Sequence, residues 1–228
     1  MEAGVSCIIP CRNGQPYLLE AIASAVAEGV DEVIVVDDGS TDASAASAQS
    51  ACGPVRVLCQ AGQGASAARN AGLAVARHGL IAFLDADDLW PAGSMTLRRQ
   101  ALAAEPALDA VYGHVQQFHS PELDAQARSR LICSPGSLAA RTFGSIVFRR
   151  RVFDRLGTFD VDLGQGEMFD FMARFSDAPL TISCLPDIVL LRRIHGANMM
   201  HPSGGGVKGY PRALKAILDR RRRTQPRA

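Results

Sequence analysis

The first hundred residues alternate between two hydrophobic patterns. Short, nearly continuous apolar runs predict buried strands, and longer stretches with apolar residues every three or four positions predict helices. The predicted strands are residues 5–10, 32–37, 55–59 and 80–84, and the predicted helices are 16–27, a short Ala/Ser-rich one capped by Ser40 or Thr41, 66–77 and 91–104. This alternation is typical of an α/β fold, with a mostly parallel, mixed sheet covered by helices on both faces.

The second half of the chain has a less regular pattern. It predicts strands at 110–118, 144–148, 180–185 and 189–193, and helices at 150–156, 166–175 and 211–223, whereas residues 120–140 are polar and turn-rich. There is no internal repeat and no long low-complexity linker. We therefore expect one domain in which residues 1–105 bind one ligand and residues 106–228 complete the site on the same sheet.

Composition and charge narrow the functional classes. The 228-residue chain has a formal net charge of +1, so no global field favours nucleic acid, and no apolar run approaches the length of a membrane span. The six cysteines show neither a C-x-x-C pair nor zinc-like spacing with histidine, which favours a reducing compartment. The first residues lack the features of a secretory signal. We expect a cytoplasmic protein that does not bind nucleic acid.

Polar residues gather at the predicted strand ends, where open parallel sheets bind their ligands. In the first such cluster, Asp37 and Asp38 leave a buried strand just before Gly39. Carboxylates in this place can accept hydrogen bonds from ribose hydroxyls or from a base N–H. A capped strand–helix turn would use the same residue types, so both interpretations stay open.

A glycine-rich segment follows the third predicted strand. Gly62, Gly64 and Ala67 fit G-x-G-x-x-A ahead of a helix, and Asp85 ends the next strand, as in a dinucleotide-binding fingerprint. That fingerprint normally follows the first strand of the fold, whereas this one follows the third. Arg69, one turn into the helix, could instead reach a phosphate or a base. A nicotinamide-dependent enzyme therefore remains one hypothesis.

Three carboxylates, Asp85, Asp87 and Asp88, crowd the end of the very apolar fourth strand. Like charges this close are unfavourable unless a cation lies between them. A hard divalent metal such as Mn²⁺ or Mg²⁺, with further oxygen ligands from a diphosphate, would resolve the conflict. The alternative is a solvated acidic turn.

The last cluster lies in the second half. Glu167 and Asp170 are three residues apart on a predicted helix and share a face, so either could supply a base for an acceptor hydroxyl. His195 follows an arginine pair and could bind a metal or a phosphate. A lone histidine is more often a structural residue, so His195 is a candidate ligand only because of these neighbours.

Taken together, these segments resemble the family 2 glycosyltransferases in residue type, order and spacing. The segments that carry the resemblance are Ile8-Ile9-Pro10, the run from Val33 to Asp42, Gly64 to Asn70, Leu84 to Asp88 and, towards the C-terminus, Arg192 to Asn198. Each motif is weak alone, and the set is specific.

The resemblance implies a GT-A fold of the nucleotide-diphospho-sugar transferase type. Residues 1–105 would form the nucleotide-sugar-binding half and residues 106–228 the acceptor-binding half. It also implies direct, inverting displacement of a UDP-like leaving group by an unidentified acceptor hydroxyl. The residues implied to contact the donor are Pro10, Arg12, Asp37, Asp38, Gly64, Arg69, Asp85 and Ala86, and those implied to hold a divalent metal are Asp87 and His195.

The sequence departs from the family at one position. Family members commonly carry Glu-Asp at the start of the second-half helix, and the second carboxylate acts as the base. Here that position is Met168, whose thioether cannot take a proton. Either Glu167 or Asp170 has the role, with Glu167 favoured because it is longer and follows glycines that permit a backbone change. Otherwise the enzyme is slow, or the protein binds a nucleotide sugar without transferring it.

The C-terminal helix predicted at 211–223 ends in four arginines, residues 220–223. A basic helical end can contact anionic lipid, where a lipid-linked acceptor would reside. The alternative is a solvated and frayed terminus.

Overall fold

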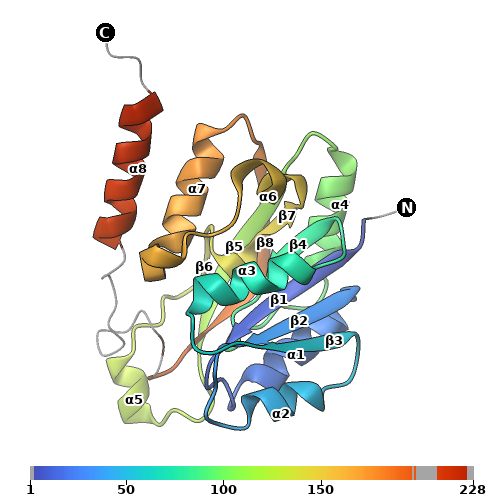
Figure 1. Ribbon diagram of the computed structural model, residues 1–228. Coiled ribbons are helices and arrows are strands. Elements are labelled where there is room, and N and C mark those ends of the chain that lie inside the picture. Colours follow the sequence, from blue (N-terminus) through green and yellow to red (C-terminus); the bar gives the residue numbers. More distant parts are fainter. Residues whose placement is uncertain (1–2, 197, 199–209, 225–228) are drawn as a thin grey trace.

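The computed structural model describes residues 3–196, 198 and 210–224, and these form one mixed sheet with helices on both faces (Figure 1). Within them the sheet has eight strands in the order β3-β2-β1-β4-β7-β5-β6, and β8 pairs with β5 off this path. The strands are β1 (Val5–Cys11), β2 (Glu32–Asp37), β3 (Val55–Cys59), β4 (Leu80–Phe83), β5 (Ala110–His119), β6 (Ser137–Ala139), β7 (Val147–Arg149) and β8 (Ile182–Ile194).

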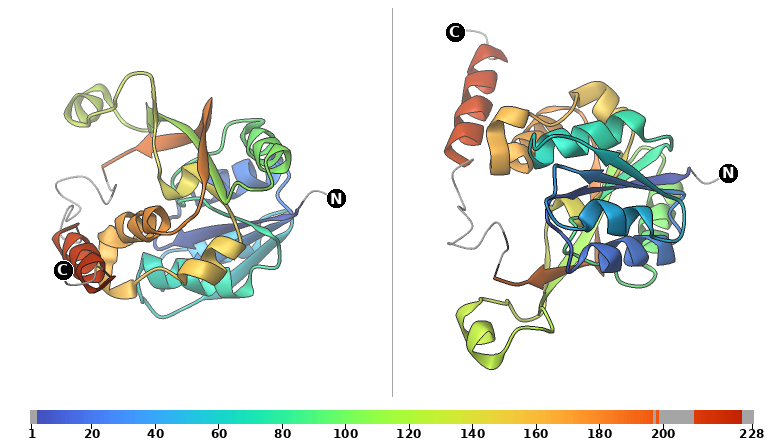
Figure 2. Two further views of the ribbon diagram at one scale, coloured as in Figure 1. Left: turned by 90° about the horizontal axis from the view of Figure 1, so that it is seen from above. Right: turned by 60° about the horizontal axis from the view of Figure 1, so that its bottom comes forward.

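The helices cover the sheet from both sides, as two further views show (Figure 2). The α-helices are α1 (Leu18–Ala27), α2 (Ser44–Gln49), α3 (Ala65–Val75), α4 (Ser94–Ala104), α5 (Ala125–Arg130), α6 (Arg151–Leu156), α7 (Glu167–Asp177) and α8 (Tyr210–Thr224). Two short 3₁₀ helices, η1 (Phe143–Ser145) and η2 (Val161–Gly166), precede β7 and α7.

The central parallel strands explain the continuous apolar runs of the sequence. Every residue of β1 and β2 is buried, as expected where helices cover both faces of a sheet. Side chains alternate along a strand, so Cys7 and Ile9 enter one core while Ile8 enters the other. The first core includes side chains of α1 and α4, and the second includes side chains of α3, α6 and α7.

The strand β7 joins the two parts of the sheet. It pairs antiparallel with both β4 and β5, β8 runs parallel to β5, and β6 pairs antiparallel with β5 at the sheet edge. One sheet therefore runs through both halves of the chain. The predicted fold class, an α/β fold with a mostly parallel mixed sheet covered on both faces, is confirmed.

Two predicted elements of the second half differ from the structure. The segments 180–185 and 189–193 form a single strand, because irregular pairing opposite Tyr112, His114 and Val115 accommodates the residues between them. The strand predicted at 144–148 begins as the 3₁₀ turn η1 and becomes extended at Val147.

The predicted cap of α2 was wrong. This helix begins at Ser44 with Ala43 at its N-cap and no side-chain cap. Ser40 Oγ accepts a hydrogen bond from the backbone N–H of Asn13, and the Thr41 N–H donates to Asn13 Oδ1. Ser40 and Thr41 therefore bind the loop after β1 instead of capping α2. They hold this loop at the edge of the pocket described next.

Two peripheral parts complete the molecule. Residues 120–140, here called the arm, contain α5 and β6 and extend away from the body (Figure 2). The C-terminal α8 packs against α7 and η2 through buried Ala213 and Ile217. No helix within the described residues combines the length and the apolar character that crossing a membrane requires.

Candidate active site

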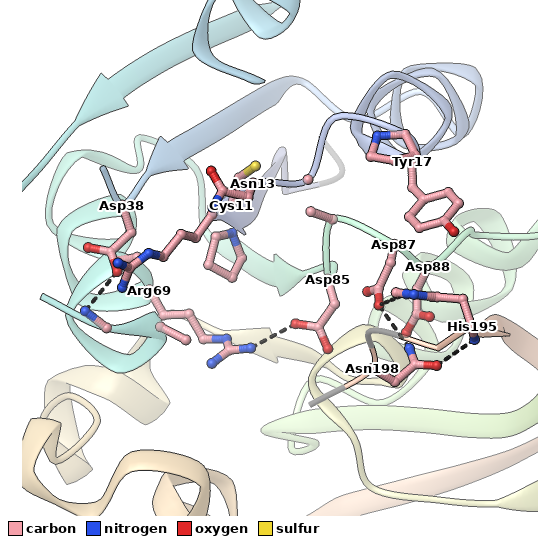
Figure 3. A pocket seen from close by; sticks show the side chains of 18 of the residues that line it. Cys11, Asn13, Tyr17, Asp38, Arg69, Asp85, Asp87, Asp88, His195 and Asn198 are labelled. Atoms are coloured by element: carbon pink, nitrogen blue, oxygen red, sulfur yellow. Dashed lines mark hydrogen bonds and ion pairs between the residues drawn. The ribbon is translucent and has the colours of Figure 1, made fainter. Parts of the chain in front are cut away.

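A pocket of about 650 Å³ lies beyond the carboxyl ends of β1 and β4. Four segments line it, namely the loop after β1, the start of α3, the acidic turn after β4 and the end of β8, and Asp38 joins them from the loop after β2. Figure 3 shows side chains from all four segments around the opening. This is the edge at which open parallel sheets bind ligands.

The lining contains most of the donor and metal residues predicted from the sequence. These are Pro10, Arg12, Asp38, Gly64, Arg69, Asp85, Ala86, Asp87 and His195. Three predicted residues, Asp37, Glu167 and Asp170, do not line the pocket. The structure thus brings the donor-side set together and leaves both candidate bases outside it.

Asp38 ties the loop after β2 to the glycine turn before α3. Its carboxylate accepts hydrogen bonds from Gln60 Nε2 at 2.7 Å, the Gln63 N–H at 2.6 Å and the Gly64 N–H at 2.8 Å. Asp37 lies behind it, where its Oδ2 accepts from the Ser40 N–H at 3.2 Å. The capped-turn interpretation therefore describes Asp37, whereas Asp38 both holds the turn and faces the pocket.

The glycines of this turn are needed for their backbone conformation. Gly62 has a φ of 66° and Gly64 a φ of 93°, which side-chain-bearing residues rarely adopt. They let α3 begin directly at the pocket wall. Arg69 follows one helical turn after the start of α3.

Arg69 is a buried cation shared by two acids. Its Nη2 donates to Asp85 Oδ1 at 2.7 Å and its Nη1 to Glu167 Oε1 at 2.8 Å. The guanidinium also lies 3.7 Å from the centroid of the Phe143 ring. Burial raises the pKa of Glu167, although the charge of Arg69 opposes this shift. Arg69 thus connects the pocket to the start of α7.

All three carboxylates of the acidic turn line the pocket. Asp87 Oδ2 accepts from His195 Nε2 at 3.0 Å and from Asn198 Nδ2 at 3.1 Å (Figure 3). Asp88 is buried and accepts the Arg193 N–H at 2.9 Å. Its pKa is raised by burial and then by the charges of Asp87 and Asp85, which is the like-charge crowding expected from the sequence.

The donor set fits a divalent cation that is shared with a ligand. Asp87 supplies a carboxylate oxygen and His195 an imidazole nitrogen at one point of the pocket wall, and both are common ligands of Mn²⁺. Within the described part of the chain, no three Asp, Glu, His or Cys side chains form a metal-binding group. Further oxygens, such as those of a diphosphate, would have to complete the coordination.

Arg193 is a structural residue of the site that the sequence did not reveal. Its side chain is 2% exposed, and it donates to the Asp87 carbonyl at 3.0 Å and to Glu20 Oε2 at 2.6 Å. Its guanidinium also lies between the rings of Tyr17 and Phe118. Arg193 therefore fixes the acidic turn to the end of β8. Its signals in the sequence were its place beside Arg192 and its position in the segment from Arg192 to Asn198 that carries the family resemblance.

Tyr17 was also not predicted. Its ring lies 4.7 Å from that of His195, and its hydroxyl donates to Glu122 of the arm. Hydrogen bonds from Ser120 and Tyr17 lower the pKa of Glu122 to about 2. The tyrosine thus links the loop after β1, the predicted metal ligand and the arm.

The start of α7 is arranged differently from the prediction. Asp170 accepts from Arg174 Nε at 2.9 Å and from Arg220 of α8, so it faces α8 and not the pocket. Met168 packs against the apolar core that contains Phe171. The position where the resemblance led us to expect a base is therefore part of the packing between α7 and the sheet.

The comparisons with known proteins agree with this geometry. Residues 6–162 match the family described as Glycosyl transferase family 2. An uncharacterized glycosyltransferase of Nostoc sp., alr2836, is 28% identical over 213 residues, which cover 85% of this chain and 66% of the relative. The succinoglycan biosynthesis protein ExoU of Rhizobium meliloti is 41% identical over 96 residues, which cover 40% of this chain and 28% of the relative. This chain thus spans less than two thirds of either protein.

Solved structures share the fold at low sequence identity. The crystal structure of S. aureus TarS 1-349 in complex with UDP-GlcNAc has a TM-score of 0.72 and 19% identity, and the alignment covers 95% of this chain and 66% of that one. The mannosyltransferase PcManGT from Pyrobaculum calidifontis, in complex with GDP-Man and Mn²⁺, has a TM-score of 0.64 and 20% identity, with coverage of 100% and 66%. These likenesses confirm the predicted GT-A type of fold.

Proposed function

Because the chain belongs to glycosyl transferase family 2, we propose that it transfers a sugar from a nucleotide diphosphate donor to an acceptor hydroxyl, with a divalent metal. The observation that carries the proposal is the pocket itself. Asp38, Arg69 and the pair Asp85 and Asp87 converge there from three different places in the sequence. This assignment favours the transferase over the nicotinamide-dependent alternative.

The proposed donor lies along the wall made by the four segments. Asp38 would accept from the nucleoside, which in the neighbouring structures is that of UDP or GDP. Arg69 and Asp85 would face the phosphates and the ribose, beside Pro10, Arg12 and Ala86. The turn at Gly64 supplies the close backbone approach at the start of α3. Residues 1–105 would thus be the donor half, and residues 106–228 the acceptor half.

The proposed metal would be held by Asp87 and His195. Mn²⁺ or Mg²⁺ would stabilise the negative charge that gathers on the diphosphate as it leaves. The residues of the chain position these two ligands. Asn198 orients the Asp87 carboxylate, Tyr17 packs on the His195 ring, and Arg193 fixes the turn that carries Asp87.

In the proposed inverting reaction, the acceptor oxygen bonds to the anomeric carbon as the bond from that carbon to the phosphate oxygen breaks. The nucleoside diphosphate takes the electron pair, and a base takes the acceptor proton. We assign the base to Glu167 and not to Asp170, since two arginines hold Asp170 away from the pocket. Glu167 Oε2 is buried and has no hydrogen-bond partner among the described residues, and burial raises its pKa, which suits proton uptake.

This assignment requires a rearrangement. Glu167 lies behind Arg69 and reaches the pocket only if that ion pair opens or the start of α7 shifts. A donor phosphate that binds Arg69 would release Glu167 from part of this interaction. The glycines before α7, including Gly164 with a φ of 55°, allow local backbone movement.

A second function is favoured by Met168. If Glu167 stays paired with Arg69 when the donor binds, the protein binds a nucleotide sugar without transferring it. The packing of Met168 in the core supports this alternative, because the described part of α7 contributes no carboxylate to the pocket lining.

Two measurements separate these functions. In a thermal-shift panel, UDP or GDP with Mn²⁺ should stabilise the protein, and NAD(H) should not. Ligand at about a hundred times its dissociation constant adds roughly 2.7 kcal/mol of stability. Mass spectrometry with a panel of donors and a mixed acceptor pool then detects transfer. Nucleotide binding without any product supports the binder, and stabilisation by NAD(H) alone contradicts both proposals.

The predicted lipid contact is independent of the transfer step. The C-terminal helix α8 contributes no described residue to the pocket, so a lipid contact through it would not involve the residues proposed for transfer.

A further inference from the structure

Besides its packed side, α8 has an exposed side that combines leucines with cations. Leu214 is 49% exposed and Leu218 is 44% exposed, one turn apart. Lys215 and Arg222 are exposed on neighbouring positions of the same helix. The neighbouring side, which carries Ala213 and Ile217 about 100° round the helix, is buried against α7 and η2. Although one side of α8 is packed, the helix therefore still presents two half-exposed leucines beside positively charged side chains.

The basic residues of α8 divide into two groups. Arg220 pairs with Asp170 and Arg221 with Asp177, so these two arginines dock the helix onto α7. Arg212 and Lys215 have no ion pair in the described part of the chain, and Arg222 reaches Asp219 only at 3.9 Å. The positive charges of Arg212, Lys215 and Arg222 are therefore not used to hold α8 on α7, and they lie on the same helix as the exposed leucines.

A second exposed apolar pair lies on the arm. Ile132 is 87% exposed and Leu138 is 73% exposed, and Arg128 and Arg130 occupy the preceding helix α5. In all three ribbon views α5 and α8 lie on the same side of the molecule, the left (Figures 1 and 2). β8 ends between them, where His195 enters the pocket. Two basic, apolar projections thus flank the edge that carries the pocket.

We propose that the exposed side of α8, together with the arm, docks on an anionic lipid surface. Apolar side chains flanked by arginine and lysine match the boundary between acyl chains and negative headgroups. A protein partner would need one continuous complementary patch, whereas a fluid surface accepts two separate contacts. If the transfer proposed above is correct, docking would turn the pocket edge towards a lipid-linked acceptor.

The test is sedimentation with phosphatidylcholine vesicles that contain or lack phosphatidylglycerol, without donor or metal. The wild-type chain should bind only the anionic vesicles. Leu214→Gln/Leu218→Gln should weaken binding about tenfold. The matched control is Leu19→Gln/Leu97→Gln, which alters leucines of 46% and 37% exposure on α1 and α4 and should bind like the wild type.

The charge test has its own control. Lys215→Gln/Arg222→Gln should weaken binding about fivefold for each charge removed. Arg77→Gln/Arg155→Gln removes the same net charge from exposed positions after α3 and on α6, and should change binding little. Ile132→Gln/Leu138→Gln tests the contribution of the arm.

Three results would overturn the proposal. These are equal binding to neutral vesicles, equal losses in the control pairs, and no vesicle binding at all. If the leucine variants instead abolish a dimer seen by sedimentation velocity, the occupant is a second copy. Hydrogen exchange of the wild-type protein guards against misfolded variants, since α8 should gain protection only with anionic vesicles. All these measurements are independent of transfer activity, so its failure leaves them interpretable.

Discussion

The acidic turn after β4 and the start of α7 both place carboxylates beside Arg69, yet they differ in access. At the turn, the side chains of Asp85 and Asp87 are 39% and 31% exposed and face the pocket. At α7, those of Glu167 and Asp170 are 7% and 3% exposed, and arginines hold them. Asp85 and Glu167 share the same arginine, so the burial of a carboxylate, and not its having a cationic partner, decides whether a ligand can reach it.

The difference also indicates that Arg69 couples the pocket to the start of α7. Asp85 and Glu167 compete for one buried guanidinium, so a ligand that draws Arg69 towards the pocket weakens its hold on Glu167. The pocket side of Arg69 is open without a ligand, and the side at α7 is closed. If the pocket binds the donor and Glu167 is the base, as proposed, donor binding would precede acceptor activation.

The largest effect is expected at the open side. Asp87→Ala removes one of two proposed metal ligands and the partner of both His195 and Asn198. It should lower metal-dependent affinity for UDP by about a hundredfold or more. Isothermal titration with and without Mn²⁺ measures this, and Asp154→Ala, an exposed acid on α6, serves as the control. Equal UDP affinity with unchanged metal dependence would remove Asp87 from the site.

The second prediction tests the closed side. If Glu167 is the base, Glu167→Gln should lower turnover by about 10²–10⁴-fold and leave donor affinity nearly intact. If Glu167 only positions Arg69, donor affinity should fall together with turnover. Single-turnover kinetics with a separate donor titration distinguish the two outcomes, and the exposed Glu105→Gln is the control.

Met168→Asp complements this experiment. It restores a carboxylate at the position where the family commonly has one, and it should raise turnover if the backbone geometry is retained. Because Met168 packs in the core, the variant should also lose stability, which thermal melting monitors. No gain in turnover from a folded variant, with full activity in Glu167→Gln, would place the base elsewhere.

The sequence predicted those features that depend on near neighbours. The alternation of strands and helices, the acidic turn and the glycine turn before α3 each lie within a few residues of the pattern that predicts them. The sequence did not predict the contacts of Arg193, whose partners Glu20 and Asp87 are 173 and 106 residues away. Such contacts depend on how β8 lies beside the acidic turn, which no local pattern specifies.

The same limit explains the two candidate bases. Helical spacing placed Glu167 and Asp170 on one side of α7, and both are indeed buried. Which surface that side meets is decided by Arg69, 98 residues earlier, and by Arg220, 50 residues later. A carboxylate's role in a site therefore could not be read from its own helix.

A smaller effect is expected in the loop after β2, where Asp37 and Asp38 can be compared directly. Asp38→Asn should weaken UDP binding by roughly 1.5–3 kcal/mol for each charge-assisted hydrogen bond lost. Asp37→Asn should have less effect, because Asp37 does not line the pocket. UDP titration of both variants measures the difference. If they weaken UDP equally, the pair acts through the turn and not through contact with the nucleoside.

The smallest effect concerns stability and pH. Burial raises the pKa of Glu167 in the folded protein above its value of about 4.3 in the unfolded chain. The group's contribution to stability is then complete below the unfolded pKa and is lost as pH rises through the folded pKa. Glutamine does not titrate, so Glu167→Gln does not lose this contribution. The free energy of unfolding of the variant minus that of the wild type should therefore increase as pH rises from about 4 to 7.

Urea unfolding of the ligand-free proteins across this range measures the gain. The exposed Glu105→Gln should show a nearly constant difference from the wild type. A difference for Glu167→Gln that moves the other way would mean that Arg69 outweighs burial and keeps the carboxylate ionised. In that case Arg69 would hold Glu167 too strongly for it to take a proton. A protein that binds a nucleotide sugar without transferring it would then explain the Arg69–Glu167 pair better than a transferase does.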